Sequence, residues 1–276
     1  MKLQSGMAAV VTGAASGIGL ALTKALCEKG INVLMADIDP RALTLAHEGL
    51  GGMAALTATQ ICDVSDKDAV ATLADAAFAQ YPTVDLIFNN AGVSSTGSVL
   101  ETTLDDWEWV LGIDLYGVIH GINSFVPRMI EQGGGYVVNT ASVAGLVSPP
   151  GTAPYNVAKH GVVTLSETLY QELQLAEANV GVTVVCPAWV QTGIADSDRV
   201  RPGGPRGDTE MGARVREAVR EATAHGRTAE SVADTILAAV ESDAFYVLTH
   251  RGMAPYIERR HREIEQGRNP TVELRE

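Results

Sequence analysis

The sequence contains few cysteines, and their spacing matches no redox or metal-binding motif. Of its 276 residues only three are cysteine, and Cys27, Cys62 and Cys186 lie far apart without a CxxC or Cys/His pattern. Neither a disulfide framework nor a structural zinc site is indicated. We expect three packed, reduced thiols and no metal site.

Basic residues and long apolar runs are also scarce. Lys and Arg total 20 against 33 Asp and Glu, which gives a formal net charge of -13. A negative chain repels polyanions, so nucleic acid and anionic lipid are not expected as partners. No stretch of about 18 apolar residues occurs, and the N-terminal stretch reaches glycine before any apolar run attains signal-peptide length. These absences predict no membrane association and a cytoplasmic location.

Apolar residues, at 46% of the chain, are nevertheless sufficient for a large core. Short apolar runs alternate with segments that carry apolar residues at three- and four-residue spacing, which predicts alternating strands and helices. Continuous apolar runs are typical of parallel strands buried on both faces, so we expect one doubly wound α/β domain over residues 1–276. The seven expected strands are 7–12, 31–36, 54–61, 84–88, 135–140, 181–186 and 245–248.

Two segments interrupt this alternation. Residues 192–226 combine Gly, Pro and charge before a short charged helical stretch, and such a long connection is typical of a lid or of a disordered loop. Residues 252–276 are dense in Arg and Glu. We interpret the second segment as a surface helix and tail, placed for a subunit contact.

The first expected strand ends in a glycine-rich turn. It runs TGAASGIG from Thr12 to Gly19, and a helix is expected to begin at once. Glycine permits a tight turn, a close approach of the backbone to a diphosphate, and close packing of helix and strand. The helix N-terminus then supplies N–H groups to phosphates. A dinucleotide site is therefore predicted at Gly13, Ser16, Gly17, Ile18 and Gly19.

The second expected strand ends at Asp37, eighteen positions after Gly19. A carboxylate at this distance reaches both hydroxyls of the adenosine ribose and repels a 2′-phosphate. Neither Ser16 nor Ile38 provides the cation that NADP requires. Asp37 thus favours NAD and disfavours NADP, with Ile38 beside it in the same site.

Tyr155 and Lys159 are four residues apart at the start of an expected helix, and Ser142 follows the fifth strand. Residues at i and i+4 share a helix face, so the ammonium group can favour ionisation of the phenol. Alone, such a pair is more often an exposed aromatic and a solvated lysine. The Tyr155–Lys159 pair indicates a catalytic site only in combination with the glycine turn.

In that combination the chain resembles the short-chain dehydrogenase/reductase family over nearly its whole length, which implies a Rossmann-like fold. The matching features follow in family order: TGxxxGIG at 12–19, Asp63, NNAG at 89–92, Ser142, YxxxK at 155–159, and Pro187 to Thr192. The resemblance implies that Tyr155 is the general acid/base, Ser142 binds the substrate oxygen, and Lys159 lowers the tyrosine pKa and holds the nicotinamide ribose. It also implies cofactor contacts from further residues: Asp63, Val64, Asn90, Ala91, Gly92, Pro187, Val190 and Thr192.

One position departs from the family pattern. Where the family has a catalytic Asn, this chain has Asp114, within IDLYG at 113–117. An ionised Asp accepts hydrogen bonds but cannot donate them. Its charge would partly offset Lys159 and weaken the pull of the ammonium on the Tyr155 proton. We therefore expect Asp114 to shift activity toward alkaline pH.

The expected substrate wall is apolar, which favours a hydrophobic secondary alcohol or ketone. No clustered Arg is expected there to bind a carboxylate, and Arg199, Arg201 and Arg206 are interpreted as a solvated loop face. Several stretches resemble, more weakly, a family branch that acts on bulky aryl alcohols, including Cα-dehydrogenases of lignin-derived β-aryl ethers. The wall residues are Ser94, Val143, Ala144, Leu146, Pro149, Trp189 and Ile194, together with residues of the long connection 192–226.

Three other functions stay open at this stage. Reduction of a 3-oxoacyl thioester is disfavoured by Asp37 and by the lack of a basic docking face for an acidic carrier. A non-catalytic NAD(H) sensor is favoured only by Asp114. An extended-class epimerase or dehydratase would carry GxxGxxG rather than the GxxxGxG of this chain. The resemblance further implies a homodimer or homotetramer, with helices near 104–130 and 154–178 at the interface.

Overall fold

A computed structural model of the protein describes residues 1–204, 207 and 209–271. Its strands form one seven-stranded sheet in the order β3-β2-β1-β4-β5-β6-β7, and each neighbouring pair is parallel. The prediction of a doubly wound parallel sheet is confirmed. The strands are β1 Ala8–Thr12, β2 Asn32–Asp37, β3 Thr57–Ile61, β4 Leu86–Asn89, β5 Gly135–Thr140, β6 Val180–Cys186 and β7 Tyr246–Leu248.

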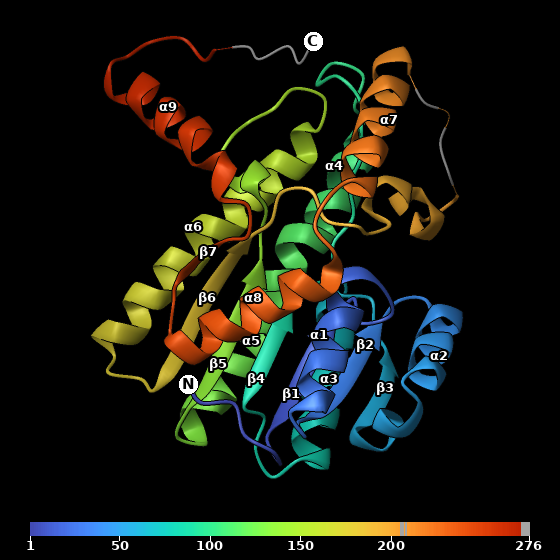
Figure 1. The fold of residues 1–276 in the computed structure, drawn as a ribbon, viewed down its shortest axis with the longest axis vertical. Helices are drawn as coiled ribbons and strands as arrows, with labels where there is room; N and C mark the ends of the chain where they lie inside the picture. Colours follow the sequence, from blue (N-terminus) through green and yellow to red (C-terminus); the bar gives the residue numbers. More distant parts are fainter. Residues whose placement is uncertain (205–206, 208, 272–276) are drawn as a thin grey trace.

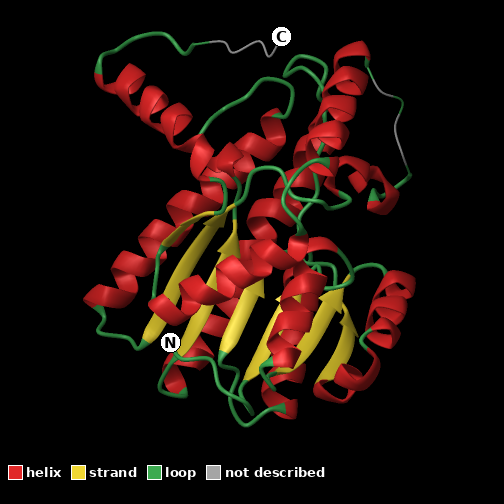
Figure 2. Ribbon diagram, in the orientation of Figure 1, coloured by secondary structure: helices red, strands yellow, loops and turns green. Residues whose placement is uncertain are grey.

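Helices cover both faces of this sheet (Figures 1 and 2). Helices α1 and α8 pack on one face, and α3, α5 and α6 pack on the other. The α-helices are α1 Gly17–Glu28, α2 Pro40–Gly49, α3 Lys67–Gln80, α4 Leu104–Leu111, α5 Gly117–Glu131, α6 Ala153–Leu175, α7 Glu210–Ala224, α8 Ala229–Ser242 and α9 Ala254–Glu265. The short helical turns are η1 Gly51–Leu56, η2 Gly112–Tyr116, η3 Val143–Gly145, η4 Ile194–Val200 and η5 Arg251–Met253.

The continuous apolar character of the strands has a direct cause in this packing. In β1, Val10 and Val11 are both fully buried, but they belong to the apolar layers on opposite faces of the sheet. Successive side chains of a strand point to opposite faces, so a sheet covered twice needs apolar residues at every position. Strand β1 lies between β2 and β4. Chain connections therefore diverge at β1, and a crevice opens there at the carboxyl ends of the strands.

Some boundaries differ from expectation. Residues 54–56 belong to the turn η1, and β3 begins only at Thr57. The double glycine at Gly51 and Gly52 supports a tight turn, and Gly51 adopts a φ of +56°. The long helix expected from 104 to 130 consists of α4 and α5 joined by η2, a turn of π-helix.

Among the described residues, one helical run is long and apolar enough to cross a membrane. This run is Leu104–Glu131. Three of its apolar residues, Val118, Phe125 and Met129, lie in the core against the sheet. A core helix meets the same length and composition criteria, so the run is weak evidence for a membrane segment.

Candidate active site

A cavity of about 1010 Å³ lies at the carboxyl ends of the strands. Its lining includes Ser142, Tyr155, Lys159 and Asp114, together with almost all the residues predicted to bind the cofactor. Gly19 is the exception, because it is buried behind the turn. A Cβ at Gly19 would lie 2.2 Å from the carbonyl oxygen of Gly13, so glycine is needed there for helix packing.

The glycine turn leaves room for a ligand at the N-terminus of α1. Gly13 adopts a φ of +64°, a region that other L-residues rarely enter. Ser16 occupies the N-cap of α1, yet its side chain makes no capping hydrogen bond and lines the cavity. Backbone N–H groups at such a terminus attract phosphate. These residues fit a dinucleotide diphosphate.

Asp37 is held at one end of the cavity by backbone donors. Its Oδ2 accepts a hydrogen bond from Ala15 N at 3.0 Å, and its Oδ1 accepts one from Asp39 N at 3.0 Å. Each oxygen keeps a second lone pair for a hydroxyl. The cavity residues between Gly13 and Val64 include Asp37 and Asp63 but no Lys or Arg. This end therefore suits ribose hydroxyls and disfavours a phosphate.

The turn at 90–92 is fixed beside β1 by Thr12. The hydroxyl oxygen of Thr12 accepts hydrogen bonds from the backbone N–H groups of Asn90 and Ala91, and Asn90 Nδ2 donates to the Thr12 carbonyl at 3.0 Å. Gly92 then lies against two of the predicted catalytic residues, because a Cβ at this position would be 3.4 Å from Asp114 Oδ2 and 3.5 Å from Lys159 Nζ. The predicted cofactor turn and the predicted catalytic residues therefore line one continuous cavity.

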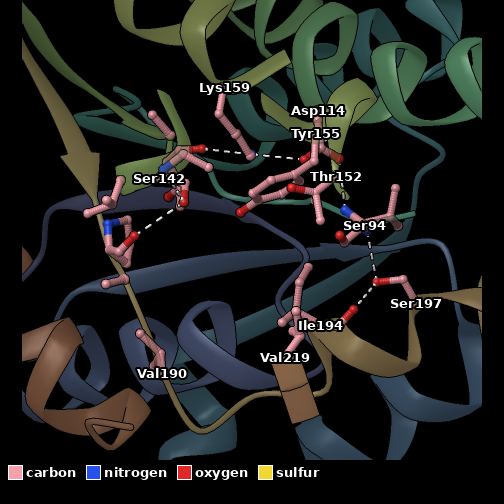
Figure 3. A pocket seen from close by; sticks show the side chains of 18 of the residues that line it. Ser94, Asp114, Ser142, Thr152, Tyr155, Lys159, Val190, Ile194, Ser197 and Val219 are labelled. Atoms are coloured by element: carbon pink, nitrogen blue, oxygen red, sulfur yellow. Dashed lines mark hydrogen bonds and ion pairs between the residues drawn. The ribbon is translucent and has the colours of Figure 1, made fainter. Parts of the chain in front are cut away.

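Ser142, Tyr155, Lys159 and Asp114 meet at the floor of the cavity (Figure 3). Ser142 caps η3, where its Oγ accepts a hydrogen bond from Ala144 N at 3.1 Å and donates to Pro187 O at 3.3 Å. Tyr155 and Lys159 lie in the first two turns of α6, as the spacing predicted. The Lys159 Nζ lies 5.5 Å from the centroid of the Tyr155 ring.

The ammonium group of Lys159 is buried and held by oxygen atoms. It donates to Thr140 O at 3.0 Å and lies 3.1 Å from Asp114 Oδ2. The other oxygen of Asp114, Oδ1, accepts a hydrogen bond from Val93 N at 2.8 Å. Asp114 is fully buried, and the π-helical turn η2 carries it into this position. Such turns often occur at functional sites.

The pKa values of these groups reflect burial and mutual charge. Burial raises the pKa of Asp114, although Lys159 opposes the change. Burial by itself would lower the pKa of Lys159, but Asp114 and Tyr155 raise it. The pKa of Tyr155 is raised by burial and by Asp114, whereas Lys159 and a hydrogen bond with Ser142 lower it. The Asp114 carboxylate therefore makes the tyrosine harder to deprotonate.

Nearly all of the predicted wall residues line the cavity. They are Ser94, Val143, Ala144, Pro149, Trp189 and Ile194. Leu146 is a correction, because it packs into the core instead. The described part of segment 192–226 also contributes to the wall, as expected, although the sequence did not single out these apolar residues. They are Val200 of η4 and Val215, Ala218 and Val219 of α7.

Segment 192–226 is tied to the rest of the wall. Ser94 N donates a hydrogen bond to Ser197 Oγ at 3.1 Å (Figure 3). Arg201 was expected on a solvated face, but it is buried and pairs with Asp106 of α4 and Asp198 of η4. That expectation was wrong because three acidic or aromatic side chains enclose the guanidinium. Arg199 is exposed as expected, and Arg206 lies outside the described residues.

The C-terminal segment also lines the cavity, which sequence reasoning missed. Met253, Tyr256, Arg259, Arg260 and Ile264 all contribute to the lining, as do Glu263 and Arg268. The expectation that no arginines cluster at the site is therefore wrong. The three- and four-residue spacing of several of these residues was the available signal, because it indicates a shared helix face. The sequence of one helix does not show which part of the fold that face contacts.

The three cysteines are buried free thiols, as predicted. Burial raises the pKa of Cys186 to about 12 and that of Cys27 and Cys62 to about 11. None therefore carries appreciable thiolate at neutral pH. Within the described ranges, no group of three or more His, Cys, Asp or Glu is placed to hold a metal ion.

Comparisons with known proteins agree with this geometry. The sequence model of the short chain dehydrogenase family matches residues 7–202. A short chain dehydrogenase/reductase from Burkholderia phymatum, solved in complex with NAD, is 40% identical, with a TM-score of 0.97 over 100% of both chains. A C alpha-dehydrogenase from a Sphingobium species is 34% identical over 91% of this chain and 82% of its own. A 1-deoxy-11-beta-hydroxypentalenate dehydrogenase from Streptomyces avermitilis is 34% identical over 88% of this chain and 84% of its own.

The chain thus belongs to the short chain dehydrogenase family, and it is an oxidoreductase by that membership. Its predicted likeness to the branch that contains C alpha-dehydrogenases is confirmed as well.

Proposed function

We propose that the protein is an NAD(H)-dependent dehydrogenase that interconverts a bulky, hydrophobic secondary alcohol and its ketone. The observation that carries this proposal is the meeting of Ser142, Tyr155 and Lys159 in the cavity that also contains the glycine turn and Asp37. The NAD complex of the Burkholderia relative supports the choice of cofactor. So does Asp37, because the adjoining lining carries no cation for a 2′-phosphate.

The residues that would hold NAD follow the length of the cavity. Asp37 would accept the adenosine ribose hydroxyls, and the α1 N-terminus with Ser16 would bind the diphosphate. Lys159 would contact the nicotinamide ribose. When bound, the nicotinamide ring supplies the site that accepts or returns hydride. The remaining contacts are those proposed for Ile18, Ile38, Asp63, Val64, Asn90, Ala91, Gly92, Pro187, Val190 and Thr192, all of which line the cavity.

The chain's own residues manage the proton and the developing charge. In alcohol oxidation the ionised Tyr155 oxygen takes the hydroxyl proton, and in ketone reduction it returns that proton to the oxygen. The Ser142 hydroxyl, which donates to Pro187 O at 3.3 Å, would turn its one hydrogen to the same oxygen and stabilise its negative charge. The buried Lys159 ammonium lowers the pKa of the phenol and so favours this exchange, against the raising effects of burial and of Asp114.

The wall suggests the kind of alcohol. Val143, Ala144, Trp189 and Ile194 give the substrate region an apolar surface, and segment 192–226 extends it as a proposed lid. The relatives named as C alpha-dehydrogenase and hydroxypentalenate dehydrogenase support a bulky substrate. A cytoplasmic homo-oligomer formed by this single domain is part of the same proposal.

An initial-rate assay for reduced nicotinamide tests the proposal. Purified protein is given NAD or NADP in parallel with a panel of aryl, alicyclic and acyl secondary alcohols at alkaline pH. We expect turnover of bulky alcohols with NAD, a large preference over NADP, and a loss of at least about 10³-fold in kcat for Tyr155→Phe. Tight NADH binding without turnover of any alcohol or matching ketone would instead favour the NAD(H)-sensing alternative, for which Asp114 is the supporting feature.

A further inference from the structure

Charge is divided unevenly along the cavity. At the β2 end its lining carries Asp37 and Asp63, whereas at the α9 end it carries three arginines, Arg259, Arg260 and Arg268, and one carboxylate, Glu263. The chain as a whole has a formal net charge of -13, so this cationic end opposes the average charge. The net negative charge of the protein does not attract anions from solution. A local cluster of positive side chains can still bind an anionic group that is placed next to it.

The two ends lie toward opposite edges of the sheet. Strands β2 and β7 are separated by β1, β4, β5 and β6, and α9 follows β7 (Figure 1). Five strand spacings correspond to about 24 Å. The arginines of α9 are therefore remote from the predicted ribose and diphosphate contacts of the cofactor. They border the side of the cavity on which Ser142, after β5, and Trp189, after β6, are found.

One face of α9 forms this border. Met253, Tyr256, Arg260 and Ile264 recur at three- and four-residue spacing and all line the cavity. Arg260 is half-buried and has no hydrogen bond or ion pair with any other described residue. Burying part of a guanidinium is unfavourable unless the charge is paired, so a half-buried guanidinium without a carboxylate partner can gain from binding an anion.

The neighbouring carboxylate is already engaged. Glu263 accepts hydrogen bonds from the Thr271 side chain and backbone, and these bonds lower the pKa of Glu263. Arg259 and Arg268 act on the same carboxylate by charge, also lowering its pKa. Arg260 is thus the guanidinium on this face that is left for a ligand.

We infer that Arg260 binds a carboxylate carried by the substrate at the end remote from the reacting hydroxyl. The substrate class is then a bulky hydroxy acid or keto acid whose apolar middle lies along the wall of the cavity. A guanidinium pairs with a carboxylate through two parallel hydrogen bonds, which fixes the orientation of the ligand as well as its affinity. This inference rests on the proposed function and makes its substrate more specific.

The test uses matched alcohols that differ only in charge. Aryl secondary alcohols bearing a terminal carboxylate on spacers of increasing length are compared with their methyl esters. We expect the best acid to exceed its ester by about tenfold in kcat/KM through a lower KM. In Arg260→Gln this preference disappears. Arg262→Gln is the matched control, because Arg262 is exposed on the same helix and does not line the cavity.

Calorimetric binding of the keto acid to the NADH-loaded protein separates this inference from the proposed function. If no alcohol is turned over but the keto acid binds more weakly to Arg260→Gln than to Arg262→Gln, the dehydrogenase proposal fails. The anion site at Arg260 is then still supported. Three results would overturn the inference. The wild type could use acid and ester with equal kcat/KM, Arg262→Gln could change kcat/KM as much as Arg260→Gln does, or both variants could bind the keto acid as tightly as the wild type does.

Discussion

Asp114 is the residue at which this site departs from the pattern that the family resemblance implies. Its carboxylate lies 3.1 Å from Lys159 Nζ, and both side chains are buried. The pair keeps Lys159 protonated, but the same negative charge raises the pKa of Tyr155. A catalytic base with a raised pKa becomes active only at higher pH. We therefore expect Asp114 to move the pH range of the proposed reaction toward alkaline values.

Asp114→Asn tests this role directly. Asn retains the oxygen that accepts from Val93 N, so the turn is preserved, while the charge beside Lys159 is removed. Because that charge raises the Tyr155 pKa, its removal should lower the pKa and move the acidic limb of kcat/KM for oxidation to lower pH. Initial rates from about pH 6 to about pH 11 measure the limb, and NADH affinity checks the fold. Unchanged rate and profile would contradict the role.

At the scale of elements, the wall of the cavity depends on a buried ion cluster. Arg201 follows η4, pairs with Asp106 of α4 and Asp198 of η4, and lies 4.7 Å above the Trp109 ring. Asp198 also pairs with Arg216 of α7 at 2.7 Å. The cluster therefore joins α4, η4 and α7. These charge pairs hold η4 and α7 beside the apolar wall of the cavity.

Arg201→Met should loosen segment 192–226. It removes a guanidinium from between two largely buried carboxylates, Asp106 and Asp198, which costs about 3 kcal/mol, or roughly 6–12 °C in Tm for a chain of this size. We expect KM to rise about tenfold with little change in kcat. Tm, KM and limited proteolysis of residues 192–226 are the measurements. Arg220→Met, which removes exposed pairs with Asp196 of η4 and Glu217 of α7, is the control and should change none of them.

The pH dependence of the cluster follows from Asp106. Burial raises the pKa of Asp106, but hydrogen bonds from Thr103 and Arg201 outweigh it and bring the pKa below its usual 3.8. A lowered carboxyl pKa contributes stability that is present above about pH 4 and is lost as the pH falls through the folded value. The cluster is thus intact throughout the pH range of the activity assays, and a KM effect of Arg201→Met there reflects the lost guanidinium.

The parts of this fold that were predictable are those set by neighbouring residues. The glycine turn, the end of β2 at Asp37 and the Tyr155–Lys159 spacing each depend on a few consecutive positions, and the structure places them as expected. Arg201 and α9 were misjudged for a different reason. Arg201 pairs with Asp106, and the cavity that α9 borders is also lined by residues such as Ser142 and Trp189. These residues are remote in sequence, so the local charge pattern suggested solvent exposure where the fold supplies a partner or a cavity.

At the scale of the whole molecule, the family resemblance implies an interface formed by the long helices. Large apolar side chains are exposed on these elements, with Tyr116 of η2 at 53% and Val157 of α6 at 50%. Exposed apolar side chains on neighbouring elements are typical of a surface covered by another subunit. Val157 lies two residues from Tyr155, on the other side of α6, so it can be changed without entering the cavity.

Val157→Glu is therefore expected to reduce the mass of the assembly. A charge placed in an apolar symmetric contact is present on both subunits. The free-energy cost of burying an unpaired charge therefore applies twice in each dimer. Light scattering after size exclusion should show a dimer or tetramer for the wild type and a smaller species for the variant. Leu45→Glu on α2 is the control, since Leu45 is similarly exposed at 59% but lies outside the predicted interface. A monomeric wild type, or equal masses for both variants and the wild type, would show that these helices do not form the contact.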